Sequence, residues 1–146
     1  MEKDKDINLY TIIIKSYKNK KVREWLIDNY INIPKEKINI NVIKLISDHP
    51  IKKFKETFLC LLGHKQLDLN VLIYISSLGY YPEAFYNALI IKCNQNSSTD
   101  SLIDFLYFNI KYVMEKDEFI DSIDYIKLIS EEKKKIIFDF IKNIYC

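Results

Sequence analysis

Residues 68–94, DLNVLIYISSLGYYPEAFYNALIIKCN, contain the pattern that decides the fold. Apolar side chains recur every three or four residues on both sides of a Gly-Tyr-Tyr-Pro break, which is the spacing of an α-helix rather than the alternation of a strand. Pro82 suits a first helical turn, because proline lacks an N–H and its φ is already helical. Gly79 suits the left-handed position after a helix. The stretch therefore predicts two helices, 68–78 and 82–94, joined by a tight antiparallel turn.

The same signals divide the rest of the chain. Pro34 and Pro50 also suit first helical turns, and Gly63 also suits a left-handed residue after a helix. Ser130 precedes Glu131 and Glu132, which favours a capped start for the last helix. We expect the other helices over residues 5–31 (one helix, or two joined near Asn19), 34–47, 50–62, 99–114 with Thr99 or Asp100 as cap, 117–128, and from 131 onward.

We predict an all-α fold in which residues 1–146 form a single compact domain, with residues 1–6 as a frayed N-terminus. About seven to nine helices pack as consecutive antiparallel hairpins, because the connections are short. Only two glycines are present, too few for the frequent turns of a β-sandwich or barrel. Two arrangements fit. One is a helical bundle around a central helix, for which the apolar segment 68–78 is the candidate, and the other is a short α-solenoid of stacked hairpins.

Composition and charge limit the classes of partner. The chain has 22 basic and 20 acidic residues, a net charge of +2, without the strong basic excess of a dedicated nucleic-acid binder. No apolar run approaches the roughly 18 residues of a membrane helix, and no targeting segment is recognisable. We expect a cytoplasmic protein with no membrane partner. The abundance of Ile, Lys, Asn and Tyr, which have A/U-rich codons, indicates an AT-rich genome.

Catalytic and cofactor motifs are not recognisable in the sequence. With glycine only at positions 63 and 79, neither a P-loop nor a dinucleotide-binding turn fits. The nearest approach to a catalytic group is Cys60 and His64, four residues apart, but Cys60 between two leucines is typical of a buried apolar position. We therefore expect no catalytic residue, no metal, no cofactor and no small-molecule substrate. The prediction is a protein that is not an enzyme.

Aromatic residues indicate a partner-binding role instead. Eleven tyrosines and eight phenylalanines are more than a small core easily hides, and surface aromatics often anchor interfaces. Tyr80 and Tyr81 lie at a predicted helix–helix corner, and Tyr17 lies near Trp25. We predict a helical protein-interaction domain, acting as an adaptor or inhibitor, with these four residues as its partner-binding positions. The oligomeric state stays open.

A second class of partner is nucleic acid. Lysines interleaved with aromatics can hold a phosphate backbone while the rings stack on bases. Lys18, Lys20, Lys21 and Arg23, close to Tyr17, form the best candidate for such a site. RNA or ribosome binding is therefore the alternative prediction.

Residues 79–110, GYYPEAFYNALIIKCNQNSSTDSLIDFLYFNI, resemble one pentatricopeptide-type hairpin. A Gly-x-x-Pro entry precedes a Tyr-Asn-x-Leu-Ile helix, and a second helix follows. A shift of 35 residues carries Phe85 and Ala88 onto Ile120 and Ile123, so the apolar rows repeat while the motif letters do not. The resemblance implies an RNA- or ribosome-associated helical-repeat protein, a function that needs several such units.

The length, the expected helix count and the apolar segment 68–78 are also similar to the anti-apoptotic and signalling-inhibitor bundles of large DNA viruses. This resemblance implies a host-interaction protein that binds an amphipathic helix of its partner in a groove. The cellular relatives of those bundles carry an Asn-Trp-Gly-Arg signature. Here the single tryptophan lies in Arg23-Glu24-Trp25-Leu26, which departs from it.

Overall fold

The fold is known from a computed structural model that describes residues 8–79, 81–95, 98–109 and 116–145. Every regular element in these ranges is helical, which confirms the predicted all-α class. The predicted frayed segment 1–6 and the predicted end of a helix at Met114 lie outside the described residues. The α-helices are α2 (Leu9–Ser16), α3 (Lys20–Asn29), α4 (Ile40–Ser47), α5 (Lys52–Gly63), α6 (Leu69–Ser77), α7 (Pro82–Asn94), α8 (Thr99–Asn109), α9 (Lys116–Tyr125) and α10 (Glu131–Tyr145), with 3-10 turns η1 (Tyr30–Asn32) and η2 (Lys35–Lys37).

Side-chain caps explain where several helices begin. Segment 5–31 forms two helices because the side chain of Asn19 accepts a hydrogen bond from the N–H of Val22 and starts α3. Pro82 occupies the first turn of α7 as predicted. The predicted helix 34–47 is wrong in its first half, because Pro34 precedes only the 3-10 turn η2. The α-helix starts after Asn39, whose side chain accepts from the N–H of Val42.

Two further helix boundaries differ from the prediction. Ser98, rather than Thr99 or Asp100, caps α8, since its Oγ accepts a hydrogen bond from the N–H of Ser101. Helix α9 ends at Tyr125 rather than near residue 128, because the chain turns there to reach Ser130, the cap of α10.

Neither glycine adopts the left-handed conformation that was predicted, since no described glycine has positive φ. Gly63 is instead the last residue of α5 and allows close packing. A Cβ at this position would lie 3.1 Å from both the Cβ and the backbone N of Ala84 in α7. At Gly79 a Cβ would lie 3.2 Å from the ring of Tyr81, which folds back over the glycine. Both glycines are explained by close approach rather than by backbone conformation.

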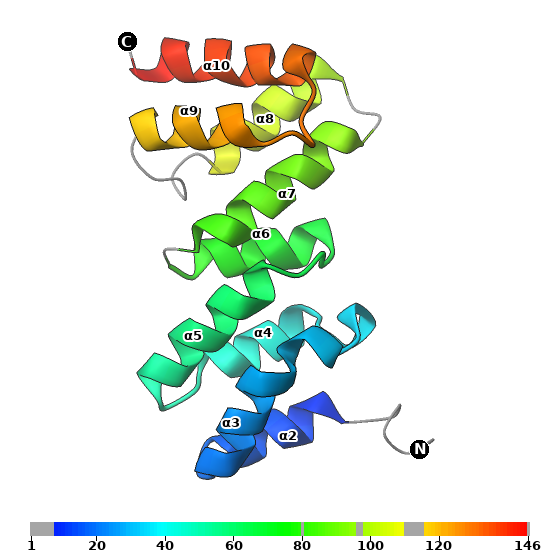
Figure 1. The fold of residues 1–146 in the computed structure, drawn as a ribbon, viewed down its shortest axis with the longest axis vertical. Helices are drawn as coiled ribbons and strands as arrows, with labels where there is room; N and C mark the ends of the chain where they lie inside the picture. The colour runs from blue at the N-terminus through cyan, green and yellow to red at the C-terminus, as the bar shows by residue number, and fades with distance from the viewer. Residues whose placement is uncertain (1–7, 80, 96–97, 110–115, 146) are drawn as a thin grey trace.

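The helices form two layers along one axis (Figure 1). In one layer α2 contacts α4 and α4 contacts α6, and at the far end α8 contacts α10; in the other layer α3 contacts α5 and α5 contacts α7. The ring contact between Phe85 of α7 and Phe119 of α9 extends the second layer. Helices α2 and α3 contact each other, as do α6 and α7, so antiparallel hairpins are the repeated unit. The helical bundle is therefore built by stacking hairpins.

The stacked helices recur at a regular interval along the chain. The helices of the first layer begin at Leu9, Ile40, Leu69, Thr99 and Glu131, which gives a period of 29 to 32 residues. A polar cap precedes each of them, and Ile38 and Leu67, the residues before two of these caps, are buried. Residues 38–43 (ININVI) match residues 67–72 (LDLNVL) in the order of their apolar and polar side chains.

Helix α6 shows what stacking does to burial. Its residues Val71, Leu72 and Ile75 are buried, whereas Asn70 and Ser77 on its other side are exposed. The segment 68–78 is therefore one-sided, as expected for stacked hairpins rather than for the central helix of a bundle. Its apolar residues face α4 and α7, and the buried residues of all the hairpins join into one continuous core.

The close contact between α5 and α7 generates a prediction. Alanine at position 63 would favour the helix by about 1 kcal/mol in an open site. Here its Cβ meets the backbone of Ala84, which cannot rotate away. We expect Gly63→Ala to lower the free energy of unfolding by about 1–3 kcal/mol in chemical denaturation. Asn70→Ala, on the exposed side of α6, is the control and should change it by less than about 0.5 kcal/mol. A stabilised Gly63→Ala protein would show that the two helices separate freely.

Candidate functional site

The two ends of the stack differ in polarity. At the C-terminal end, most of the exposed side chains of α10 are charged and Lys135 pairs with Asp139 at 3.1 Å, although Ile144 is 41% exposed. At the other end, Trp25 of α3 is 40% exposed and only Leu26 of that helix is buried. Helix α5, which has a neighbour on each side in its layer, buries five residues. The first hairpin thus leaves apolar surface uncovered in the described structure.

This uncovered surface is a groove between α2 and α3, which we call the terminal groove. Its volume is about 400 Å³, and it is lined by Ile12, Lys15, Asn19, Lys21, Val22 and Trp25. Ile12 and Val22 are half-buried against the core, so they form a firm apolar floor beside the exposed indole. The α2–α3 turn brings these residues together, because positions 12 and 15 share one face of α2 while 22 and 25 share one face of α3.

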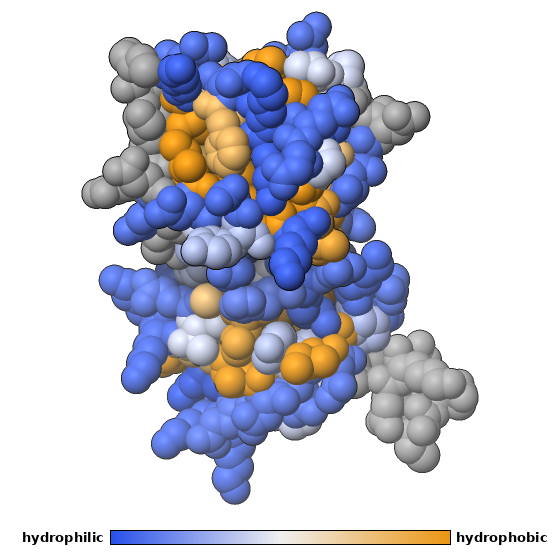
Figure 2. Space-filling model, turned by 45° about the horizontal axis from the view of Figure 1, so that its top comes forward, coloured by the Kyte–Doolittle hydropathy of each residue, from blue (hydrophilic) through white to orange (hydrophobic). Residues whose placement is uncertain are grey.

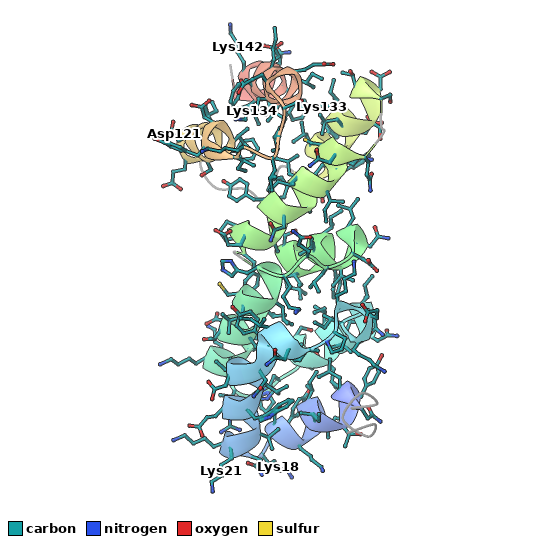
Figure 3. All side chains as sticks on the ribbon, turned by 45° about the vertical axis from the view of Figure 1, so that its right-hand side comes forward. Lys18, Lys21, Asp121, Lys133, Lys134 and Lys142 are labelled. Carbon is teal, nitrogen blue, oxygen red and sulfur yellow. The ribbon has the colours of Figure 1, made fainter. Side chains whose placement is uncertain are left out.

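The charge around the terminal groove is positive. Lys15 and Lys21 line it, no acidic side chain among the described residues does, and Lys18 is exposed in the turn that joins the two helices. Lys18 and Lys21 both lie at the end of the stack formed by α2 and α3 (Figure 3). Within the described part of the chain, no ion pair neutralises any of these three lysines. Their charges are therefore available to a ligand.

A polar cluster inside the protein holds the α2–α3 turn in place. The guanidinium of Arg23 donates a hydrogen bond to the carbonyl oxygen of Ser16 at 2.8 Å, which satisfies the C-terminal end of α2. The hydroxyl of Tyr17 donates to the carbonyl oxygen of Leu45 at 2.6 Å and ties the turn to α4. Burial, and next the charge of Asp48, raise the pKa of Tyr17.

His49 is the buried member of the polar cluster and contacts Ser16 at the end of α2. It is 4% exposed, its Nδ1 accepts a hydrogen bond from the N–H of Ile51, and its Nε2 lies 3.0 Å from the hydroxyl of Ser16. Because Nδ1 accepts, the neutral ring carries its proton on Nε2 and donates to Ser16, which donates in turn to the carbonyl oxygen of Ile13. Burial first, and then the charge of Arg23, lower the pKa of His49. The native cluster contains neutral histidine.

The structure brings only some of the predicted partner-binding residues to the surface. Trp25 is exposed in the terminal groove, whereas Tyr17 is half-buried and acts within the fold. Tyr81 is a correction: its side chain is in the core, and burial, followed by the charge of Glu56, raises its pKa. The reason is that its ring folds back over Gly79 instead of pointing outward. Tyr80 lies outside the described residues.

The predicted nucleic-acid site is divided between two surfaces. Lys18 and Lys21 lie at the end of the stack, while Lys20 and Arg23 line a separate groove of about 690 Å³ between α3 and α5. The carboxylates of Glu24 and Asp28 line that same groove, so its charge is mixed. Arg23 also makes its hydrogen bond to Ser16 inside the protein. The four basic residues do not form one continuous basic surface.

The Cys60–His64 pair is not arranged as a nucleophile and base. No hydrogen bond joins the two side chains, both of which are described, and the Nδ1 of His64 lies 4.0 Å from a carboxylate oxygen of Glu83. Cys60 is exposed, so its prediction as a buried apolar position is wrong: it lies on the solvent side of α5, opposite Phe58 and Leu62. In the described ranges, no group of three or more His, Cys, Asp or Glu side chains could hold a metal ion.

Lys134 of α10 is buried, although the adjacent Lys135 is exposed. The Nζ of Lys134 donates to the carbonyl oxygen of Asp124 at 3.0 Å, beside Glu131 at 3.7 Å. The lysine therefore satisfies the C-terminal end of α9. Lys133 and Lys134 lie with Lys142 at the end of the stack opposite Lys18 (Figure 3).

Other exposed hydrophobic residues lie outside the terminal groove, and sequence reasoning did not single them out. On the face drawn in Figure 2, polar side chains predominate and hydrophobic side chains gather in separate patches. Tyr107 and Phe108 of α8 are 65% and 70% exposed, and Tyr125 and Leu128 are also exposed near the C-terminal end. None of the described helices is both long enough and apolar enough to cross a membrane.

Comparison of the chain with models of known protein families, with curated proteins and with solved structures finds no match.

The state of His49 generates a prediction about pH. The unfolded chain takes up a proton near pH 6.5, whereas the folded protein resists protonation because the pKa of His49 is lowered. We therefore expect the free energy of unfolding to fall as the pH drops below about 6.5. Chemical denaturation between about pH 7.5 and 5.5 measures this. His49→Gln should remove the dependence and His64→Gln, at the exposed histidine, should keep it. An unchanged pH dependence in His49→Gln would contradict the neutral cluster.

Proposed function

We propose that this chain is a helical-repeat protein that acts by binding a partner protein at the terminal groove of its first hairpin. The observation that carries the proposal is the groove itself, in which apolar side chains from two helices meet beside lysines. The exposed side chains of α10 are mostly charged, with Ile144 as an apolar exception, while α2 and α3 present Ile12, Val22 and Trp25 together in one groove at the other end. Terminal repeats ordinarily carry a polar outer face, so an apolar end indicates a surface that a partner covers.

The character of the terminal groove suits protein recognition. Trp25 offers a large side chain whose ring is rigid, and tryptophan is among the residues that most often dominate binding energy. The lysines beside it form the polar rim that surrounds the apolar centre of a typical interface. The internal hydrogen bonds of Arg23 and Tyr17 hold the turn, so binding requires little ordering of the site. An adaptor or inhibitor role would use this surface directly, without catalysis.

RNA or ribosome binding is the weaker alternative. Lys20 is exposed but shares its groove with the carboxylates of Glu24 and Asp28, and Arg23 makes a hydrogen bond within the protein. Lys18 and Lys21 are the other two cations of the predicted cluster. A phosphate backbone would favour a longer basic surface. The experiment below separates the two classes.

Affinity purification from the native source tests the proposal. The double variant Ile12→Ser/Trp25→Ser removes apolar contacts from the terminal groove. We expect the amount of partner protein that co-purifies with the variant to fall by about tenfold or more relative to the wild type. A tenfold weaker affinity corresponds to a loss of about 1.4 kcal/mol in binding free energy. Thermal melting followed by circular dichroism verifies that the variant is folded. Nuclease treatment should leave the bound proteins in place.

The matched control is Tyr125→Ser/Leu128→Ser, which replaces two residues that are 82% and 64% exposed near the other end of the stack. It should retain the same partners as the wild type. Partners that remain bound to the Ile12→Ser/Trp25→Ser protein would contradict the proposed site. Partners that nuclease releases would favour the RNA alternative.

A further inference from the structure

We infer that the occupant of the terminal groove is an amphipathic α-helix that carries acidic residues beside its apolar face. This inference rests on the proposed function and adds the chemistry of the partner. Two separate properties of the first hairpin support it: the geometry of its free face and the sign of its charge.

The geometry favours a helix as the occupant. Along the stack, the surface of each hairpin is covered by further helices: α4 packs on α2 and α5 packs on α3. The terminal groove is the opposite face of that first hairpin, with the same two helices as its walls. An apolar floor of Ile12 and Val22 between two antiparallel helices accepts side chains spaced three and four apart on a partner helix. A docked helix would continue the stacking by which the rest of the protein is built.

The charge favours an acidic helix. Lys15 and Lys21 lie on opposite walls of the groove, and none of the described residues that line it is acidic. Helix α3 begins with Lys20 and Lys21 and has no acidic residue in its first turn, although basic residues at the positive end of a helix dipole reduce its stability. Folding does not account for this arrangement, whereas an acidic ligand would be held by both the lysines and the dipole. Carboxylates beside the apolar stripe of the partner would meet Lys15 on one side and Lys21 on the other.

The single tryptophan makes the test direct, because Trp25 lies in the groove and is the only indole in the chain. The probe is a synthetic helical peptide of roughly 18 residues with leucines at helical spacing and glutamates beside them. A matched peptide replaces every glutamate by lysine. Titration of each peptide is followed by the fluorescence of Trp25. We expect the acidic peptide to bind at least about tenfold more tightly than the basic one, and its affinity to fall with added salt.

Charge reversal in the protein completes the test. In Lys15→Glu/Lys21→Glu the indole is kept, and we expect the preference to reverse so that the basic peptide binds more tightly. The control Lys127→Glu/Lys142→Glu makes the same change of charge at exposed positions away from the groove, and it should keep the wild-type preference.

Two results would overturn the inference. If the wild type binds neither peptide or binds both equally, an acidic helix is not the occupant. The groove-dependent capture of protein partners described above would still support the proposed function, so the two failures are distinguishable. If sedimentation shows that the wild type dimerises and that Trp25→Ser is monomeric, a second copy of the chain occupies the groove instead.

Discussion

The packing of each hairpin on its neighbours is the constraint on which the rest of the structure depends. A two-helix hairpin buries one side of each helix against its partner and leaves an apolar face that only another hairpin can cover. The apolar faces of the inner helices are covered in this way. Within the layers, α4 lies between α2 and α6, and α5 lies between α3 and α7. Helices α6 and α7 also pack on each other within their hairpin. At Gly63 and Ala84 the second layer packs so closely that no larger side chain fits without displacement. The continuous core is the sum of these neighbour contacts.

The same constraint explains why function is sought at an end of the stack. Among the described residues, stacking supplies covering helices for the inner hairpins, and the two ends of the described stack present different surfaces. Helix α10 turns charged residues outward, and buried Lys134 joins it to α9. Helices α2 and α3 instead leave Trp25 beside an apolar floor, on a turn that Arg23 and Tyr17 hold by hydrogen bonds to main-chain carbonyls. The polar cluster therefore belongs to the fold, while the surface above it is available for binding.

Local signals in the sequence were enough to predict the all-α class and many helix boundaries. Pro82 and Ser130 each start a helix through the backbone of the next few residues, so their effects can be predicted without knowing the rest of the fold. The stacking could not be predicted from such local signals, because it depends on contacts between helices about 30 residues apart. Their caps and apolar residues occupy equivalent positions, but the residue types at these positions mostly differ. Trp25 was predicted from its residue type, but Ile12 became part of the site only through the turn between α2 and α3. Tyr81 was predicted at the surface but is buried, because its ring folds back over Gly79 in the preceding turn.

Hydrogen exchange of the protein, alone and bound to its captured partner, tests most directly whether the free end of the stack is the binding surface. Exchange reports the opening of each helix separately, so the binding surface is located without any substitution. We expect partner binding to slow exchange in α2 and α3, while α8 and α10 at the opposite end exchange as in the unbound protein. Slower exchange confined to α8, α9 and α10, with α2 and α3 unchanged, would contradict the assignment of the terminal groove.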